Sequence, residues 1–320
     1  MLRVAVTLFI AFFVPILLTP LFIRIQKRYD IGQRIRTEGP DLHQHKTGTP
    51  TMGGSIIFLA VALSLGYFHP EDSRVYASFA LLLSFGLVGL IDDLIKFYKD
   101  RSLGLKARNK IALQFTISIL FLYWLFQNNL LDKTIIVPFQ SNLIVTAPLF
   151  YIPFTILVLL STTNAVNLSD GLDGLATGLI IIAMLAFAKI AFAQEKESLG
   201  IFALIMIFSC AGFLVFNFHP AKIFLGDVGA LGLGGALAAI GVFSNAELFL
   251  LIIGGVFVLE TSSVIIQVIS IKWRQKPVFL MSPLHHHFEM KKWKEVQIVA
   301  LFWGLGLIFA VLGLMAYPFK

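Results

Sequence analysis

Long apolar segments recur from one end of this 320-residue chain to the other, and they restrict the fold more than any other feature. A helix needs roughly 20 predominantly apolar residues to cross a bilayer. Segments of about that length lie near residues 4–23, 54–68, 75–95, 111–127, 149–166, 175–193, 199–217, 230–243, 248–271 and 296–317. Charged residues make up only 13% of the chain, which leaves little room for a soluble domain. The sequence therefore predicts one all-α polytopic membrane domain, residues 1–320, with about ten transmembrane helices.

Basic residues are distributed unevenly between the connecting segments. Of the 25 Lys and Arg, 19 lie in four segments, at residues 24–50, 96–110, 218–229 and 272–295. Because cytoplasmic loops carry the excess of Lys and Arg, these segments are predicted to be cytoplasmic and both termini periplasmic. The β-branched stretch at 134–145, interrupted by Pro138, then predicts a short periplasmic β-hairpin between two spans.

Two adjacent carboxylates, Asp92 and Asp93, interrupt the apolar stretch SFGLVGLIDDLIKFY. A carboxylate at the centre of a membrane helix costs roughly 2.5–3.5 kcal/mol. Two like charges side by side also repel each other and favour a cation nearby. The predicted topology puts the pair at the cytoplasmic end of the third span, just before Lys96. At that depth the cost is small, and the acids can reach both lipid and water.

Most other unusual polar residues fall at the same predicted face. They are Lys46 in the first basic segment, Asp170 and Asp173 after the fifth span, Asp227 after the seventh, and His285, His286 and His287 in the last basic segment. Spans crowd together there, so these groups can converge on one cleft. Glu260 is the exception, because it lies within a predicted span and must be paired or line a groove.

Each of these motifs also has a structural explanation. An aspartate at a helix end is usually a solvated cap. Asn167, Asp170 and Asp173 are spaced by three residues, which does not fit a calcium loop. Neighbouring histidines in one short loop seldom all bind one ion, which disfavours a zinc site. The glycines of GDVGALGLGGALA predict close helix packing rather than a dinucleotide fingerprint, since Leu237 replaces the last required glycine.

Phosphoryl transfer explains several carboxylates and cations at a membrane surface. A phosphate that attacks a diphosphate brings together about four negative charges. Carboxylates offset this charge by holding Mg²⁺, which prefers oxygen ligands. Lysine and histidine neutralise the remaining phosphate oxygens, and one carboxylate can accept a proton from the attacking group. If the attacking group carries a lipid tail, the site must lie at the membrane edge.

Five motifs, in order along most of the chain, resemble a known family: HKTGTPTMGG, GLIDDLIK, NAVNLSDGLDGLA, NFHPAKIFLGDVGALGLGG and PLHHHFE. The chain resembles the bacterial phospho-N-acetylmuramoyl-pentapeptide transferases, within the polyprenyl-phosphate N-acetylhexosamine-1-phosphate transferase superfamily. PLHHHFE favours this branch over relatives that transfer N-acetylglucosamine phosphate, whose corresponding loop differs.

The resemblance implies a ten-helix homodimer in the bacterial inner membrane, with its active site on the cytoplasmic face and no nucleic-acid partner. It would transfer phospho-MurNAc-pentapeptide from UDP-MurNAc-pentapeptide to undecaprenyl phosphate, forming lipid I and UMP. The reaction would require Mg²⁺ and would be the first membrane step of peptidoglycan synthesis.

The resemblance also implies roles for single residues. Asp227 would hold Mg²⁺, and Asp92 and Asp93 would orient or deprotonate the lipid phosphate, with the choice of base left open. His285 would contact phosphate or the surroundings of the metal. The residues similar to the nucleotide-sugar pocket are Lys46, Asn167, Asp170, Gly171, Leu172, Asp173, Asn217, Phe224 and Gln267, with His286 and His287 shaping the adjoining loop. Phe224 could stack on uracil or anchor the chain at the membrane interface.

Two alternative functions remain open from the sequence. The nearer is an N-acetylglucosamine-1-phosphate transferase, which would use the same site with a different sugar donor. The other is a secondary transporter or Mg²⁺ channel, but transporters place their binding acids near the midplane. Only Glu260 lies that deep in the predicted spans.

Overall fold

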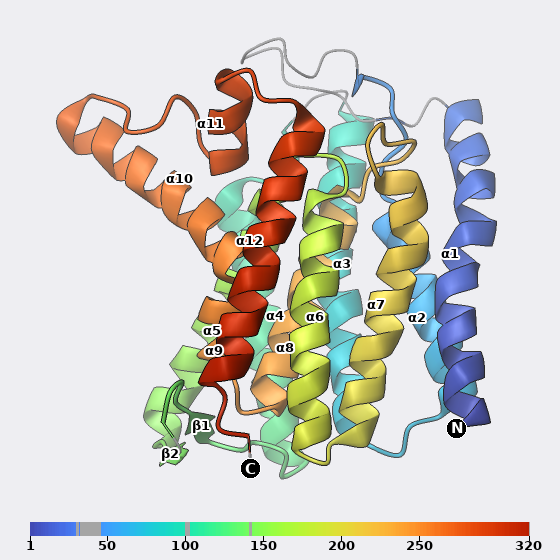
Figure 1. Ribbon diagram of the computed structural model, residues 1–320, viewed down its shortest axis with the longest axis vertical. Coiled ribbons are helices and arrows are strands. Elements are labelled where there is room, and N and C mark those ends of the chain that lie inside the picture. Colours follow the sequence, from blue (N-terminus) through green and yellow to red (C-terminus); the bar gives the residue numbers. More distant parts are fainter. Residues whose placement is uncertain (30–31, 33–45, 100–102, 141–142, 320) are drawn as a thin grey trace.

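The computed structural model describes residues 1–29, 32, 46–99, 103–140 and 143–319, and these residues form a helical bundle (Figure 1). Its long helices are α1 (Leu2–Arg28), α3 (Ser73–Tyr98), α4 (Ala107–Gln127), α5 (Pro148–Leu168), α6 (Leu175–Ala193), α7 (Glu197–Asn217), α8 (Gly226–Phe243), α10 (Gly255–Arg274) and α12 (Glu295–Ala316). Its shorter helices are α2 (Gly54–Phe68), α9 (Phe249–Ile253) and α11 (Leu284–Met290).

Within the described residues, nine helices are long and apolar enough to cross a membrane. Helix α2 is also apolar but has only 15 residues. The prediction of an all-α polytopic membrane protein is therefore confirmed. The N-terminus and the described C-terminal residues lie at one end of the bundle, the end that also carries the hairpin (Figure 1). Which side of the membrane this end faces stays a prediction.

The predicted β-hairpin is confirmed by strands β1 (Thr134–Ile136) and β2 (Leu143–Val145), which pair antiparallel. Asn245, which follows α8, fixes the hairpin to the bundle. Its side-chain nitrogen donates to the carbonyl of Thr134 at 2.9 Å, and its own carbonyl accepts from the N–H of Ile136 at 2.9 Å. These bonds fix the hairpin to the turn between α8 and α9.

The predicted continuous span at 248–271 is divided in the structure into α9 and α10. The break falls at Gly254, followed directly by Gly255, and glycine is a common cause of helix kinks. After the break, α10 leans away from the bundle and leads to α11 at the end opposite the hairpin (Figure 1). Because of the break, α10, which carries Glu260, runs in a different direction from the other spans. It leads to the segment with His285, His286 and His287, called the histidine segment below.

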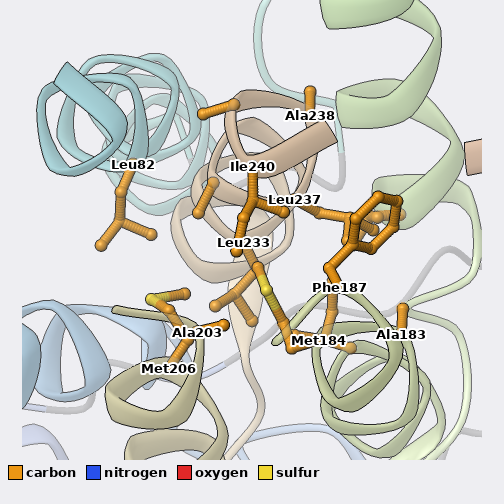
Figure 2. Packing of buried hydrophobic residues seen from close by; sticks show 14 of the residues in the cluster. Leu82, Ala183, Met184, Phe187, Ala203, Met206, Leu233, Leu237, Ala238 and Ile240 are labelled. Atoms are coloured by element: carbon orange, nitrogen blue, oxygen red, sulfur yellow. The ribbon is translucent and has the colours of Figure 1, made fainter. Parts of the chain in front are cut away.

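Helix α8 is the centre of the bundle, since every residue from Val228 to Phe243 is buried. Figure 2 shows Leu233, Leu237 and Ile240 among side chains of α3, α6 and α7, including Leu82 and Met184. The glycine-rich sequence permits this position because small residues let helix backbones approach closely. The prediction that these glycines serve helix packing is confirmed.

The closest approach of α3 to α8 lies next to the acids. A Cβ atom on Gly89 would stand 2.1 Å from the carbonyl oxygen of Asp227, so any other residue would push the two helices apart. Asp92 and Asp93 follow within one turn of Gly89. The packing of these two helices therefore brings carboxylates from distant parts of the chain together.

Candidate active site

The three predicted catalytic carboxylates meet at the end of the bundle opposite the hairpin. Asp92 and Asp93 lie near the end of α3, and Asp227 lies in the first turn of α8. One oxygen from each lies within 4.8 Å of the others. We call these three residues the aspartate cluster.

Separate backbone groups hold the two adjacent acids. Asp92 Oδ1 accepts the N–H of Leu105, before α4, at 2.7 Å. Asp93 Oδ2 accepts the N–H of Val228, in the first turn of α8, at 3.2 Å. The two carboxylates therefore keep different orientations although they are neighbours in sequence.

Lys96 lies at the centre of the aspartate cluster. Its Nζ is 2.8 Å from Asp92 Oδ2, 3.4 Å from Asp93 Oδ1 and 3.1 Å from Asp227 Oδ2. Its side chain is 31% exposed, so it can leave this position without crossing the protein interior. The cation that the acid pair was expected to favour is thus present one helical turn away.

A second lysine and an amide fix Asp227. Lys110 Nζ donates to Asp227 Oδ2 at 2.8 Å and to Asn167 Oδ1 at 3.1 Å. Asn167 Nδ2 in turn donates to Asp227 Oδ1 at 3.0 Å. The predicted pocket residue Asn167 therefore supports the predicted metal ligand directly.

The aspartate cluster carries more negative than positive charge. Its three carboxylates face two ammonium groups, and Asp170 stands close by. Burial and the charges of Asp227, Asp93 and Asp173 raise the pKa of Asp170 to about 8. A bound divalent cation would relieve this excess.

The donor set fits Mg²⁺. It consists of carboxylate oxygens, the ligand type that Mg²⁺ prefers, and Mg²⁺ commonly uses one or two carboxylates together with substrate phosphates. Asp227 is the most accessible of the three, with a side chain 20% exposed against 5% for Asp92 and 6% for Asp93. These residues therefore suit the ion that the sequence led us to expect.

A second cluster of polar side chains lies at the same end of the bundle and contains its own lysine. Lys46 Nζ lies 2.7 Å from both Asp173 Oδ1 and Glu295 Oε1, and His219 Nδ1 lies 3.0 Å from Asp173 Oδ2. Lys46 also stands 5.9 Å from the ring centre of Phe224. We call Lys46, Asp173, His219 and Glu295 the lysine cluster. Asp173, His219 and Glu295 are close enough to hold a metal ion, but the ammonium group of Lys46 already binds both carboxylates.

Asp173 is firmly ionised within the lysine cluster. Burial alone would raise its pKa, but hydrogen bonds from Lys46 and from the N–H of Ala221 hold the pKa below its usual value. Its own N–H donates to Glu295 Oε1 at 2.6 Å. The cluster thereby joins the turn before α6 to the first residue of α12.

Two other predicted pocket residues use their amides to fix loops. Asn217 accepts from Thr177 Oγ1 at 2.8 Å and donates to the carbonyl of Ile223 at 3.0 Å. Gln267 Oε1 accepts two backbone N–H groups at residues 278–279, each at 2.9 Å. Both residues lie at the expected end, and both shape the segments around the site.

The two apolar residues predicted for the pocket differ in access. Leu172 is buried, with 3% of its surface exposed. Phe224 is half-buried, and its backbone pairs with the segment before α2 through Pro50 and Gly53 at 2.8 and 2.9 Å. Phe224 therefore has a fixed backbone and a ring that stays partly accessible beside Lys46.

His285 is enclosed between two elements. Its Nδ1 lies 3.2 Å from Glu260 Oε1, and a Cβ on Gly171 would stand 2.1 Å from its Nε2. Glu260 is thus paired, which was one of the two possibilities expected for it. Gly171 is required because no larger residue leaves space for this imidazole.

The three histidines have different neighbours. His286 Nδ1 lies 2.7 Å from Glu289 Oε2, and His287 Nδ1 accepts the N–H of Leu280 at 3.1 Å. Burial and Lys291 lower the pKa of His287. His286 and His287 therefore order the segment between α10 and α12, whereas His285 is buried against Gly171, in the turn that carries Asp170 and Asp173.

Sequence reasoning assigns no role to three of the residues that surround the carboxylates: Lys96, Lys110 and Glu295. Lys96 follows the acid pair at the i+3 and i+4 spacing of helix neighbours, which is a signal that could have identified it. In the sequence, Lys110 lies 117 positions from its partner Asp227, and Glu295 lies 122 positions from its partner Asp173. No local pattern indicates such pairings.

Comparison with known proteins gives a consistent result. The sequence profile of Glycosyl transferase family 4 matches residues 75–245. A protein of Halalkalibacterium halodurans named phospho-N-acetylmuramoyl-pentapeptide-transferase is 46% identical over 313 residues, covering 96% of this chain and 95% of the relative. Proteins with the same name from Oceanobacillus iheyensis and Desulforudis audaxviator are 46% and 45% identical, covering 96% and 98% of this chain and the same shares of the relatives. All of the aspartate cluster falls inside the matched family region.

Proposed function

The chain belongs to the phospho-N-acetylmuramoyl-pentapeptide-transferase family, and on that premise we propose the reaction it performs. It is a phosphoglycosyl transferase that moves phospho-MurNAc-pentapeptide from UDP-MurNAc-pentapeptide to undecaprenyl phosphate. The products are lipid I and UMP, and the step is the first membrane reaction of peptidoglycan synthesis. The observation that carries the proposal is the aspartate cluster, with Lys96 and Lys110, at one end of a membrane bundle.

The location of the site suits two substrates that arrive from different phases. The aspartate cluster lies at the end of α3 and the start of α8, where a polyprenyl phosphate can present its head group from the bilayer. The bias of Lys and Arg supports a cytoplasmic position for this end, where a nucleotide sugar is available. We therefore assign the protein to the bacterial inner membrane, with the active site on the cytoplasmic face.

The reaction exchanges one phosphoanhydride for another. An oxygen of the lipid phosphate forms a bond to the sugar-bearing phosphorus, and the bond from that phosphorus to UMP breaks. No separate energy source is needed. The chain must hold the negatively charged groups together in the correct geometry.

Charge neutralisation is divided among the residues of the aspartate cluster and its lysines. Asp227, the most accessible carboxylate, would hold Mg²⁺ with help from Asp92 or Asp93. When bound, the ion would offset the charge of the diphosphate. Lys96 and Lys110 can turn from the carboxylates to phosphate oxygens as substrate and metal enter, because each already contacts Asp227.

The acid pair handles the proton and the orientation of the attacking phosphate. Asp92 and Asp93 point in different directions because separate backbone groups hold them. One carboxylate can accept a proton from the lipid phosphate while the other orients the lysine between them. The lysine cluster and Phe224 offer a charged and aromatic surface for the nucleotide sugar.

We also propose that the protein is a homodimer. The family resemblance supports it, and crosslinking of the detergent-purified protein, followed by mass measurement of the complex, tests it. A monomer at all protein concentrations would contradict the dimer and leave the proposed reaction untouched.

The direct test of the proposed reaction is UMP release by purified protein. Release should require UDP-MurNAc-pentapeptide, a polyprenyl phosphate and Mg²⁺ together, and a lipid-linked product should form in equal amount. Product from UDP-N-acetylglucosamine in place of the muramoyl donor would show the neighbouring branch of the superfamily instead. Solute uptake into proteoliposomes, with no lipid-linked product, would reject a transferase.

A further inference from the structure

A buried carboxylate–histidine pair joins α10 to α11 beside the active site. Glu260 is 0% exposed and His285 is 1% exposed. Glu260 Oε1 lies 3.2 Å from His285 Nδ1 and accepts the backbone N–H of His285 at 3.3 Å. A single carboxylate oxygen thus holds both the backbone and the ring of this histidine.

Packing alone does not explain the pair. Glu260 Oε2 and both ring nitrogens of His285 have no hydrogen-bond partner in the described part of the chain, and all three are buried. The contact between ring and carboxylate has the distance of an ion pair but not the alignment of a hydrogen bond. Burying polar groups without partners is costly, whereas apolar side chains would fill the space at no such cost. What separates this pair from other buried polar atoms without partners is its place against the turn formed by residues 170–173.

The orientation of the ring indicates where that ligand lies. The Nδ1 side of His285 faces Glu260, and the Nε2 side lies against Gly171. Gly171 belongs to the turn between Asp170 and Asp173, which contacts the lysine cluster and stands close to the aspartate cluster. Nε2 of His285 therefore lies against the turn that connects the lysine cluster with the neighbourhood of the aspartate cluster.

We propose that Glu260 is a positioning residue for phosphoryl transfer. Its carboxylate holds the Nδ1 side of His285, so that Nε2 is presented to a phosphate oxygen of the substrate at the turn formed by residues 170–173. The partner of one ring nitrogen determines the protonation and orientation of the other, so loss of the carboxylate leaves the imidazole free to turn. The inference rests on the proposed function and extends it to a residue buried in α10.

The pair also connects the site to the leaning helix. Glu260 lies on α10, which departs from the bundle after Gly254, and His285 lies on α11 (Figure 1). Because the contact spans both helices, α10 fixes the position of the catalytic ring. Removal of the carboxylate should therefore slow the chemical step more than it weakens binding of the nucleotide sugar.

The experiment compares four variants of the full-length protein with wild type: Glu260→Gln, Glu260→Asp, His285→Gln and the double variant Glu260→Gln/His285→Gln. UMP release gives kcat and KM for each. We expect Glu260→Gln to lower kcat about 10–100-fold, the usual cost of losing a supporting partner, while KM changes less than about threefold. Because Glu260 acts through His285, the double variant should be no slower than His285→Gln alone. Glu260→Asp keeps the charge and should retain more turnover than Glu260→Gln.

A matched control separates this role from a general need for buried carboxylates. Glu247 is also buried, with 1% of its surface exposed, and its Oε2 also lacks a partner among the described residues. Glu247→Gln should keep wild-type kcat. An equal loss in Glu247→Gln, additive losses in the double variant, or wild-type kcat in Glu260→Gln would each overturn the inference. If Glu260→Gln does not fold, Glu260→Asp with turnover no higher than that of His285→Gln would also overturn it. Absence of UMP release from wild type would instead reject the proposed function.

Discussion

The two ends of the bundle bury similar groups but give them different partners. At the hairpin end, Lys196 donates to the carbonyl of Phe243 at 2.7 Å and to Asn245 Oδ1 at 3.2 Å. Tyr151 donates to Glu247 at 2.8 Å. At this end the lysine and one oxygen of the glutamate thus have neutral partners within the chain. At the other end, Lys96 is shared by three carboxylates, and Lys110 and Lys46 also face acids.

This difference separates a structural use of buried charge from a chemical one. A lysine that donates to a carbonyl oxygen closes a helix end and has little reason to move. Carboxylates that share ammonium groups can exchange those partners for a metal ion and phosphates without leaving a charge unpaired. Substitutions at the end that carries the aspartate cluster should therefore reduce turnover or weaken substrate binding, and those at the hairpin end should change stability.

The largest effect is expected for Asp227→Asn. The variant keeps the shape of the side chain but removes the charge that would hold Mg²⁺, so turnover should fall about 10³-fold or more, the scale of losing a preorganised electrostatic group. The remaining rate should need more Mg²⁺ or respond differently to Mn²⁺, which accepts nitrogen and amide ligands more readily. The measurement is a titration of UMP release with each ion.

His285→Gln is the matched comparison for that titration. It should lose rate without a comparable change in the metal requirement, because His285 is assigned to phosphate. The value to compare is the metal concentration that gives half-maximal UMP release. If it is unchanged in Asp227→Asn, or changes strongly in His285→Gln alone, the metal must instead be assigned to the histidine segment.

The next effect is expected for the acid pair. Asp92→Asn and Asp93→Asn should each lower turnover by at least about 10²-fold, the scale of a positioned acid–base group. Protein yield and nucleotide binding should change much less, since asparagine can still accept the N–H groups of Leu105 and Val228. Near-normal turnover in either variant would make that residue a structural acid, like those of the hairpin end.

A smaller effect is expected for the lysine cluster. Glu295→Gln leaves Lys46 paired with Asp173 and keeps an acceptor for the N–H of Asp173. The KM for the nucleotide sugar should rise roughly 3–10-fold, about 1 kcal/mol, while kcat stays near wild type. Steady-state kinetics with varied nucleotide sugar gives both values. A fall in kcat with unchanged KM would place Glu295 with the reacting groups instead.

The smallest effect on activity is expected for Glu247→Gln, which should change stability. Burial raises the pKa of Glu247 from 4.5 to about 7. Between these pH values the folded protein holds a proton that the unfolded chain has lost, so wild-type stability should fall as the pH rises from about 5 to about 7 and then level off. The contribution amounts to at most about 3 kcal/mol.

The glutamine in the Glu247→Gln variant has no proton to lose, although its amide oxygen can still accept the hydrogen bond from Tyr151. As the pH rises from 5 to 8, the thermal midpoint of this variant should therefore increase relative to that of wild type. Its UMP release should be unchanged. If the midpoints of variant and wild type differ by a constant amount over this pH range, the raised pKa of Glu247 is wrong. A large loss of turnover would show that this end of the bundle also serves the reaction.

The class of fold and the gathering of the acids at one end of the bundle could be predicted from the sequence. A membrane span is a local property, since bilayer thickness requires about 20 apolar residues wherever the segment lies. The turn chemistry around Pro138 likewise indicated the hairpin without knowledge of the rest of the chain. Asp92, Asp93 and Asp227 were identifiable because charge within apolar sequence is costly and therefore conspicuous.

Which of these charges meet depends on the tertiary structure. Lys110 reaches Asp227, Glu295 reaches Lys46, and Glu260 reaches His285 because of how helices rotate about their axes and how closely they pack. The close contact at Gly89 and the change of direction at Gly254 set those positions. Periodicity along one segment carries no information about a partner on another helix. Hydrophobic burial fixes the helices in place, and the pairing of charges follows from that packing.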